Sequence, residues 1–264
     1  GYWTIAIFGV DARDNSIEKS TNSDVIILCN INRDTGEIKL VSVYRDSYLN
    51  INDKGAYSKI NQAYFVGGPK QAVEALNRNL DLQIQDYMTF NWKAVANAID
   101  VLGGVDIELS KAEFFYINSF ITETVKATGI GSRQLTHAGM NHLDGEQALI
   151  HARNRSIGNS DYRRTERQQE VLMAAFAKIK DLGVFEIADL VKDVLPMVTT
   201  DLSLWDITGY AMDVMNIGTD EIASYRIPEE GAYTPQTIDG MQVLVPDLEQ
   251  NRQYLQQILY HAGE

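Results

Sequence analysis

Five arginines crowd into a fifteen-residue stretch of an otherwise acidic chain. They are Arg153, Arg155, Arg163, Arg164 and Arg167. The 264 residues together carry a formal net charge of −13, so the stretch is not part of a general basic character. Like charges this close repel one another, and an anion that accepts several planar donors at once would offset the repulsion. The alternative is a solvated, charged helix face, which is the commonest origin of a charge run.

A helix predicted over 161–180 sorts these side chains by face. At about 100° per residue, its apolar stripe passes through Val171 and must face the interior. Continued toward the start of the helix, the stripe meets Asp161, Arg164 and Gln168. An arginine on a buried stripe is costly unless it has partners. Those partners are either a bound anion or Asp161, three residues earlier on the same face.

An ion pair inside that helix leaves Arg153 and Arg155 unexplained. The two are separated by one residue, so their side chains share a face if the segment is extended. They follow the end of one predicted helix and precede the start of another. Helix N-termini contribute partial positive charge and free N–H groups. The stretch therefore predicts a site for a multiply charged anion, with phosphate or pyrophosphate preferred.

Two aspartates near the N-terminus are candidate metal ligands. Asp11 follows the first predicted strand and Asp24 opens the second, so side-by-side strands would bring both carboxylates to one sheet edge. Mg²⁺ prefers such hard oxygen ligands and leaves other positions to water and phosphate. The alternative is that both are ordinary turn and strand-end aspartates. Arg45 ends another strand near that edge, unless it pairs with Asp46 or Glu37.

The elements that position these residues alternate along the chain. Strands are predicted over 4–10, 24–31, 38–45, 84–91, 105–109, 222–227 and 241–245. Helices are predicted over 57–68, 69–80, 92–104, 145–153 and 161–180, and near 185–195, 203–216 and 247–261. The second and third strands form a hairpin through "NRDTGE", and Asp144 with Gln147 forms a capping box. This order predicts one layered α/β domain with a mixed sheet.

Composition narrows the class of protein. Apolar residues make up 45% of the chain and aromatic residues 9%, as in an ordinary globular core. The acidic balance argues against nucleic-acid binding, which needs a basic field. Cys29, the single cysteine, cannot form an internal disulfide. Because the chain opens directly on the strand "YWTIAIFGV", we expect that a segment preceding it, such as a membrane anchor, is absent here.

Many separated segments together resemble the LytR-CpsA-Psr family. They include "IAIFGVDAR", "VLGGVDIEL", "GMNHLDGEQALIHARNR" and "DYRRTERQQEVL", in the family's order, and the match covers roughly residues 3 to 180. The resemblance implies a single α/β/α sandwich with a central mixed β-sheet over 1–264. It also implies a bacterial enzyme anchored in the membrane by one N-terminal span, with this domain extracytoplasmic. Members transfer glycopolymers, such as teichoic acid or capsule, from a polyprenyl-pyrophosphate carrier to peptidoglycan, commonly with Mg²⁺; Mn²⁺ is the alternative metal.

The resemblance also assigns roles residue by residue. Four arginines match the pyrophosphate clamp: Arg45, Arg153, Arg155 and Arg164. Two aspartates match metal ligands: Asp11 and Asp24. Further polar or basic positions match Asp161, Gln168, Lys59 and Arg13, and Arg163, which flanks the helix stripe, joins the substrate-binding candidates. Asn22 departs from the pattern, because many members carry arginine there and this chain reads "NSD" where they read "RSD".

These roles imply a phosphotransferase. Fixed guanidiniums and Mg²⁺ would stabilise the charge that develops when a sugar phosphate moves to a hydroxyl. Either Asp161 or a carboxylate beside the metal is the expected general base. Two alternatives stay open: a hydrolase that cleaves polyprenyl pyrophosphate with water, and a non-catalytic domain that binds lipid phosphate, for which Asn22 is the motivating departure.

Overall fold

The computed structural model describes residues 1–11, 22–158, 160–217 and 222–260. Contacts divide the chain into two compact units. The first unit comprises Gly1–Thr89, Thr199–Ser203 and Met212–Glu264, and the second comprises Phe90–Val198 and Leu204–Ala211. That the two make one functional domain stays a prediction.

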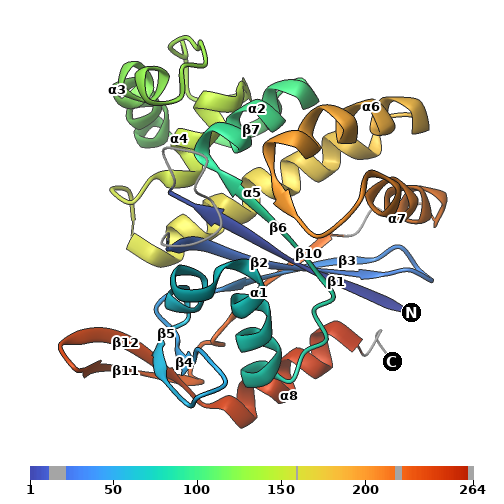
Figure 1. The fold of residues 1–264 in the computed structure, drawn as a ribbon. Helices are drawn as coiled ribbons and strands as arrows, with labels where there is room; N and C mark the ends of the chain where they lie inside the picture. The colour runs from blue at the N-terminus through green and yellow to red at the C-terminus, as the bar shows by residue number, and fades with distance from the viewer. Residues whose placement is uncertain (12–21, 159, 218–221, 261–264) are drawn as a thin grey trace. The chain divides into compact units, whose positions relative to one another are not determined.

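A six-stranded sheet forms the centre of the first unit (Figure 1). Its order is β10 (Ile222–Ile227), β3 (Ile38–Val43), β2 (Ser23–Asn32), β1 (Tyr2–Val10), β6 (Asp86–Asn91) and β9 (Thr199–Thr200). β1, β2 and β3 pair antiparallel, whereas β10 runs parallel to β3. The sheet is therefore mixed, and the predicted α/β fold with a central mixed sheet is confirmed.

The hairpin between β2 and β3 forms where the sequence places it. The side-chain oxygen of Asn32 accepts hydrogen bonds from the backbone N–H groups of Asp34 and Thr35. Gly36 then adopts φ 76°, a left-handed conformation that glycine reaches without steric cost. This local turn chemistry aligns β2 with β3 and brings the end of β3 back to the start of β2.

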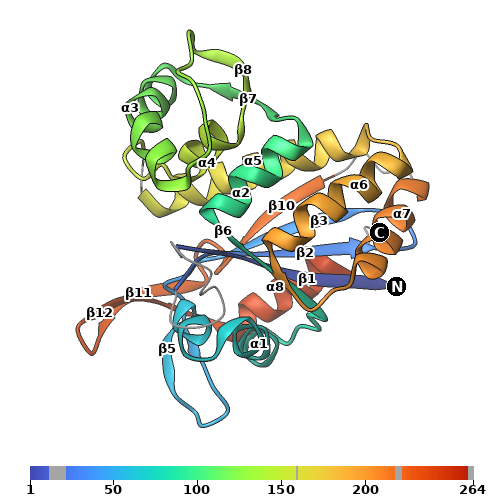
Figure 2. The same cartoon turned by 45° about the horizontal axis from the view of Figure 1, so that its top comes forward.

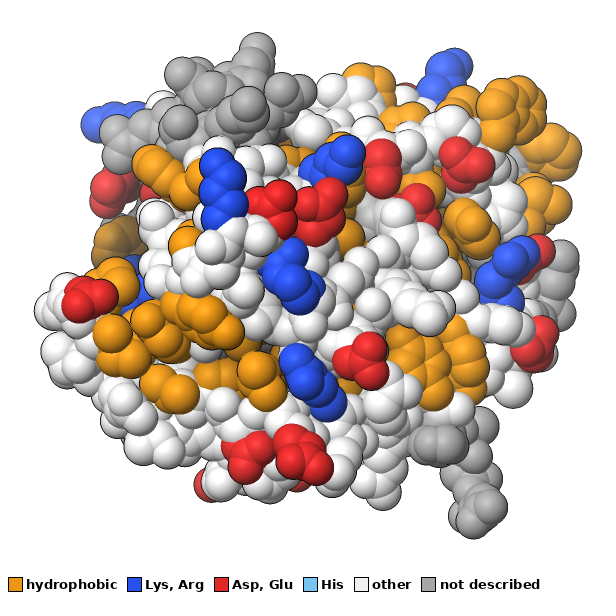
Figure 3. All heavy atoms as spheres, turned by 60° about the horizontal axis from the view of Figure 1, so that its bottom comes forward, with side chains coloured by type: hydrophobic (Ala, Val, Ile, Leu, Met, Phe, Trp, Pro, Cys, Tyr) orange, Lys and Arg blue, Asp and Glu red, His pale blue; other side chains and the backbone are white. Residues whose placement is uncertain are grey.

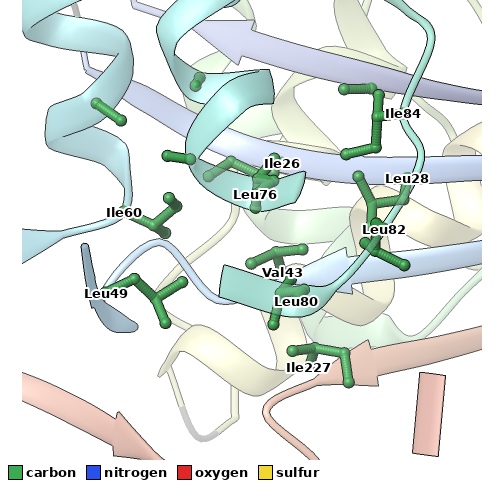
Figure 4. Close-up of a cluster of buried hydrophobic side chains, with 14 of the residues drawn as sticks. Ile26, Leu28, Val43, Leu49, Ile60, Leu76, Leu80, Leu82, Ile84 and Ile227 are labelled. Carbon is green, nitrogen blue, oxygen red and sulfur yellow. The ribbon is translucent and has the colours of Figure 1, made fainter. Parts of the chain in front are cut away.

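Two helices cover one face of this sheet, α1 (Asn61–Leu80) and α8 (Leu248–Tyr260) (Figure 1). Leu28 of the sheet and Leu76 of α1 belong to one buried cluster (Figure 4). The cluster also takes in Leu255 of α8. Each such side chain contributes about 1.5–3 kcal/mol when fully buried. The sheet that carries the candidate metal ligands is thus anchored to a packed layer of helices.

One predicted helix is partly wrong. The stretch 57–68 was expected to be helical throughout, but Tyr57–Lys59 forms strand β5, which pairs with β4 (Tyr48–Asn50). This pairing depends on a partner strand that local periodicity does not reveal. The boundary expected between two helices is confirmed in α1, where Gly68 has non-helical angles of φ 73° and ψ −165° just before Pro69.

The second unit is mainly helical (Figure 2). Its elements are α2 (Trp92–Leu102), β7 (Val105–Leu109), α3 (Lys111–Thr128), β8 (Gly139–Leu143), α4 (Gly145–Arg153), α5 (Ser160–Lys180), α6 (Val184–Val194), a 3-10 turn (Leu195–Met197) and the first part of α7 (Leu204–Ile217). Buried residues from several of these elements pack together, including Ile117 of α3, Leu143 of β8 and Ala148 of α4. The helix α3 was not predicted from the sequence.

Capping residues set the helix ends in this unit as the sequence predicts. Gly103 closes α2 at φ 93°. Asp144 and Gln147 form the complete capping box at the start of α4, each side chain bonding the other's backbone N–H. These ends fix where α4 begins, and its nine residues then end at Arg153.

The surface of the protein carries both charged and hydrophobic side chains. On the face turned forward in Figure 3, Lys and Arg side chains are interspersed with Asp and Glu, and hydrophobic side chains gather in patches. Within the part of the chain that the structure describes, no helix is both long and apolar enough to cross a bilayer. The last hairpin adds β11 (Tyr233–Ile238), which was not predicted, to β12 (Met241–Pro246).

Candidate functional site

Strand pairing in the first unit brings the two candidate metal ligands to one end of the sheet. β1 and β2 are antiparallel, with Gly9 opposite Val25 and a register shift just after Gly9. Asp11 follows β1 and is exposed, and Asp24 lies at the start of β2. A Cβ on Gly9 would lie 2.9 Å from the Val25 Cβ, so glycine permits the close pairing here. The expected juxtaposition of the strand ends is present.

Arg45 lies at the same end and contacts one of these aspartates. Its Nη1 donates to the Asp24 Oδ1 at 2.7 Å, and both side chains are partly exposed. Asp46, a partner that the sequence left open for Arg45, instead forms an ion pair with Lys59 at 3.0 Å. Two ion pairs, Arg45–Asp24 and Lys59–Asp46, therefore form where β2 begins and β3 has ended.

Asn22 precedes β2 rather than lying within it. Its Oδ1 accepts a hydrogen bond from the Gln62 Nε2 of α1 at 2.9 Å, and the residue is exposed. The side chain thus has a protein partner but no charge to offer an anion. Arg13, the basic residue expected to compensate for Asn22, lies outside the described residues.

These residues fit a divalent cation that is shared with a phosphate. Among the residues that the structure describes, no three or more His, Cys, Asp or Glu side chains gather in a way that could hold a metal alone. Mg²⁺ commonly takes only one or two carboxylates and fills its remaining positions with water and substrate phosphate. Asp11 and Asp24 offer that donor set, which also suits Mn²⁺. Their role as ligands stays a prediction.

In the second unit, Arg153 and Arg155 stand in different settings. Arg153 is the last residue of α4, and its guanidinium carbon lies 2.9 Å from the ring centroid of Trp92, a cation–π contact. Asn154 then leaves the helix with φ −62° and ψ 117°. Arg155 follows in the connecting loop and is exposed. Trp92 was not among the candidate residues, and its place at the start of α2 gave no signal of this contact.

The start of α5 carries the other candidates. Arg164 is buried, with 6% of its side chain exposed, and its Nη2 lies 3.3 Å from the Asp161 Oδ1. The ion pair considered as an alternative is therefore present, and it leaves the Asp161 carboxylate 41% exposed. Gln168, one turn further along, is partly buried. Arg163 points to solvent and pairs with Glu166 at 3.1 Å.

Burial divides the arginines of this stretch into two groups. Arg155 and Arg163 are exposed, whereas Arg164 and Arg167 each expose about 5% of the residue. A guanidinium stays charged when buried, because its pKa lies far above neutral pH. An acidic chain has thus placed fixed positive charge in its interior at the start of α5. Of the two buried arginines, Arg164 can bind and stabilise an anion, and a solvated helix face does not explain its burial.

The comparisons with known proteins agree with this chemistry. The profile of the LytR_cpsA_psr family matches residues 1–258. A polyisoprenyl-teichoic acid–peptidoglycan teichoic acid transferase TagU from Oceanobacillus iheyensis is 31% identical over 261 residues, which cover 94% of this chain and 72% of that protein. Its counterpart from Enterococcus faecalis is 27% identical over 213 residues, or 80% of this chain.

Solved structures give the same result. A structure described as TagT bound to LI-WTA superposes with a TM-score of 0.74 at 25% identity, over 98% of this chain and 90% of that one. The chain spans 65% of the length of the Enterococcus faecalis relative, about two thirds. A match that covers nearly every residue, with the arginine stretch and both aspartates inside it, assigns the family. The chain belongs to the LytR-CpsA-Psr family.

Proposed function

We propose that this protein transfers a glycopolymer from a polyprenyl-pyrophosphate carrier to a hydroxyl of peptidoglycan. The observation that carries the proposal is the buried Arg164, which stands beside Arg153 and Arg155 in sequence at the junction of α4 and α5. The similar proteins named as teichoic acid transferases support the choice of substrate class. A teichoic acid is therefore the first glycopolymer to test.

The arginines of the second unit bind the pyrophosphate in this proposal. Arg153, Arg155 and Arg164 donate charge-assisted hydrogen bonds to its oxygens, and Arg163 and Gln168 add donors nearby. Stacking on Trp92 holds the Arg153 guanidinium before substrate arrives. Donors fixed in this way stabilise developing negative charge with little reorganisation.

The charged residues of the first unit have their own role in this proposal. Asp11 and Asp24 would hold Mg²⁺, and the ion would supply positive charge that offsets the charge of phosphate oxygens. Arg45 keeps Asp24 in place through its 2.7 Å hydrogen bond and contributes a fixed positive charge at this end of the sheet. Lys59, held by Asp46, adds a second cation at this end of the sheet. Asn22 contributes an amide, and Arg13 a further charge.

The reaction balances as a phosphoryl transfer. The acceptor hydroxyl oxygen attacks the phosphorus that bears the sugar, and the bond from that phosphorus to the bridging oxygen breaks. Polyprenyl phosphate leaves with the negative charge. The proton of the hydroxyl passes to a carboxylate, either Asp161, which is 41% exposed and already bonded to Arg164, or an aspartate beside the metal.

The same proposal places the protein at the outer face of a bacterial membrane. Both the lipid carrier and the peptidoglycan are used there, and a single N-terminal span would anchor the domain. Protease treatment of intact spheroplasts tests this, with the full-length protein detected through a C-terminal tag. Digestion from outside is expected, and protection until the cells are lysed would place the domain in the cytoplasm.

Product analysis separates transfer from its rivals. The purified protein is given a glycopolymer labelled in its sugars and linked to polyprenyl pyrophosphate, with Mg²⁺ and a peptidoglycan oligosaccharide. The expected product carries the label on the oligosaccharide. Release of free labelled glycopolymer phosphate in spite of the acceptor would identify a hydrolase. Tight binding of the lipid with no product under any metal would identify a non-catalytic binding domain.

A further inference from the structure

One buried arginine has no part in the clamp described above. Arg167 lies on α5 one turn after Arg163, and its side chain is 6% exposed. Its Nη1 donates to the backbone carbonyl of Asn154 at 3.2 Å, and its Nη2 donates to the carbonyl of Ile157 at 2.9 Å. Both acceptors belong to the loop between α4 and α5. Arg155 lies between them in that loop.

The loop depends on these bonds for its shape. Asn154 is fully buried, and its side-chain oxygen accepts a hydrogen bond from the backbone N–H of Ser156 at 3.0 Å. This hydrogen bond closes a small turn just after α4 ends. No β-strand is assigned to residues 154–158. The guanidinium of Arg167 therefore bridges two points of the loop that stand on either side of Arg155.

Other charged groups hold Arg167 itself. Its Nη2 lies 3.8 Å from a carboxylate oxygen of Glu113 on α3. The second Glu113 oxygen lies 3.6 Å from the Nδ1 of His151, which is fully buried on α4. The Nε2 of His151 lies 3.1 Å from Glu170 on α5. Three helices thus converge on this set of groups, and all of them belong to the second unit.

The geometry argues against a direct contact between Arg167 and substrate. Both terminal nitrogens donate to backbone carbonyls, and one also faces a carboxylate, so neither is aimed outward. Arg155 shows the opposite arrangement, because its side chain is exposed while the carbonyls of Asn154 and Ile157 on either side of it accept from Arg167. Arg167 therefore holds the loop, and Arg155 presents its charge to solvent.

We propose that Arg167 is a positioning residue for the anion site: it holds the loop from Asn154 to Ile157 so that Arg155 meets the phosphate, without touching the phosphate itself. The inference rests on the proposed function, since it takes Arg155 as a pyrophosphate ligand. It extends that function to a residue whose burial would otherwise mark it as part of the core.

A double-mutant cycle tests the proposal, with farnesyl pyrophosphate as the probe and titration calorimetry as the measurement. Arg167→Lys should weaken binding about tenfold, the size of one lost charge-assisted hydrogen bond of Arg155. In an Arg155→Ala background, the same change should weaken binding no further, because Arg167 acts through Arg155. Additive losses would show that Arg167 contacts the anion directly and would overturn the proposal.

Hydrogen exchange supplies a second readout. The amide of Ser156 should exchange faster in Arg167→Lys than in the wild-type protein, because its turn is no longer held. Arg252→Lys is the matched control: its Nε donates to the carbonyl of Asn79 in the first unit, and it should change neither binding nor the Ser156 amide. Faster exchange with unchanged binding in Arg167→Lys would reduce Arg167 to a purely structural residue.

A milder variant covers the case in which Arg167→Lys does not fold. Glu113→Gln removes the charge beside Arg167 and keeps both loop bonds, so we expect a two- to threefold loss of binding that disappears in the Arg155→Ala background. A loss that persists there would overturn the proposal. If Arg155→Ala alone binds the probe normally while the Ser156 amide still depends on Arg167, the proposed function fails and the loop-holding role survives.

Discussion

Two arginine–aspartate pairs, one in each unit, differ in the solvent exposure of their side chains. Arg45 and Asp24 expose 23% and 29% of their side chains, so water reaches both partners. Arg164 exposes 6% while Asp161 exposes 41%. A pair with both members in water contributes little to stability and exchanges partners easily. A buried cation with an exposed partner is costly without an anion and is already positioned to receive one.

The difference assigns separate tasks to the two pairs. In the proposed metal site, Asp24 would exchange Arg45 for a metal ion at small cost, because water and the metal would replace the lost contact. Arg164 cannot move to water without unpacking the start of α5. The first pair therefore suits a site that must exchange ligands, and the second suits a fixed positive charge.

The largest expected effect is on turnover and comes from the partly exposed pair, Arg45–Asp24. Asp24→Asn should abolish Mg²⁺-dependent transfer, because it removes one of the two carboxylates proposed to hold the metal. Folding stability should change by less than about 1 kcal/mol, as for an exposed ion pair. Product formation and urea unfolding measure the two effects. Asp53→Asn, in an exposed turn, is the matched control, and marked unfolding of Asp24→Asn would point to a structural aspartate instead.

The second-largest expected effect is on lipid binding and comes from the pair with the buried arginine, Arg164–Asp161. Arg164→Met should weaken prenyl-pyrophosphate binding by about 1.5–3 kcal/mol, the value of a hydrogen bond to a charged group. The same variant should be as stable as the wild-type protein or more so, because a buried cation is replaced by an apolar side chain of similar length. Calorimetry and urea unfolding report both. Loss of stability together with full binding would reverse the comparison.

A buried carboxyl in the second unit extends the contrast to acids. Glu146 is fully buried, and this desolvation raises its pKa above the ordinary value, with Asp144 and Asp100 adding to the rise and a hydrogen bond from Thr128 opposing it. The folded state then holds this proton more tightly than the unfolded state does. Stability from this group is present below the unfolded pKa and falls as pH rises through the folded pKa.

Glu146→Gln should remove that dependence. Relative to the wild-type protein, the variant should gain stability as pH rises from about 4 to 7, because it carries no charge to bury. Thermal unfolding measured across this range checks the sign. Parallel curves for the two proteins would show that Glu146 ionises in the fold without cost.

The smallest expected effect concerns Asn22. Asn22→Arg should fold normally and raise affinity for a prenyl pyrophosphate by about two- to fivefold, because an exposed arginine adds a donor fork at modest gain. The bond from Gln62 to Asn22 would be lost, which offsets part of the gain. Weaker binding with an unchanged response to Mg²⁺ would mean that another group, such as Arg13, already fills that space.

Local chemistry explains what the sequence could predict. The capping box at Asp144, the glycine that ends α2 and the stripe on α5 each depend on residues a few positions apart. The misassigned segment depends on a distant partner, because residues 57–59 form a strand by pairing with β4. The helix α3 carries local signals that were not read from the sequence: Ser110 caps its start by accepting from the Glu113 N–H, and Gly129 ends it.

The same division holds for the candidate site. The two aspartates could be brought together from sequence, because antiparallel neighbours place one strand's end beside the next strand's start. The role of Arg167 could not, since it flanks the apolar stripe and only the fold of the 154–157 loop decides which way it turns. The burial of Arg164 followed from its place on the apolar stripe, whereas the burial of Arg167 beside the stripe depends on the surrounding fold.

The stacking of Arg153 on Trp92 also makes the site visible by its own fluorescence. Indole emission responds to a charge near its ring, and this guanidinium lies 2.9 Å from the ring centroid. Of the three tryptophans, Trp3 is buried and Trp205 is 83% exposed, so each differs from Trp92 in its surroundings. An anion that draws Arg153 aside alters the emission of Trp92, and the light emitted on titration follows the arrival of the phosphate without any label.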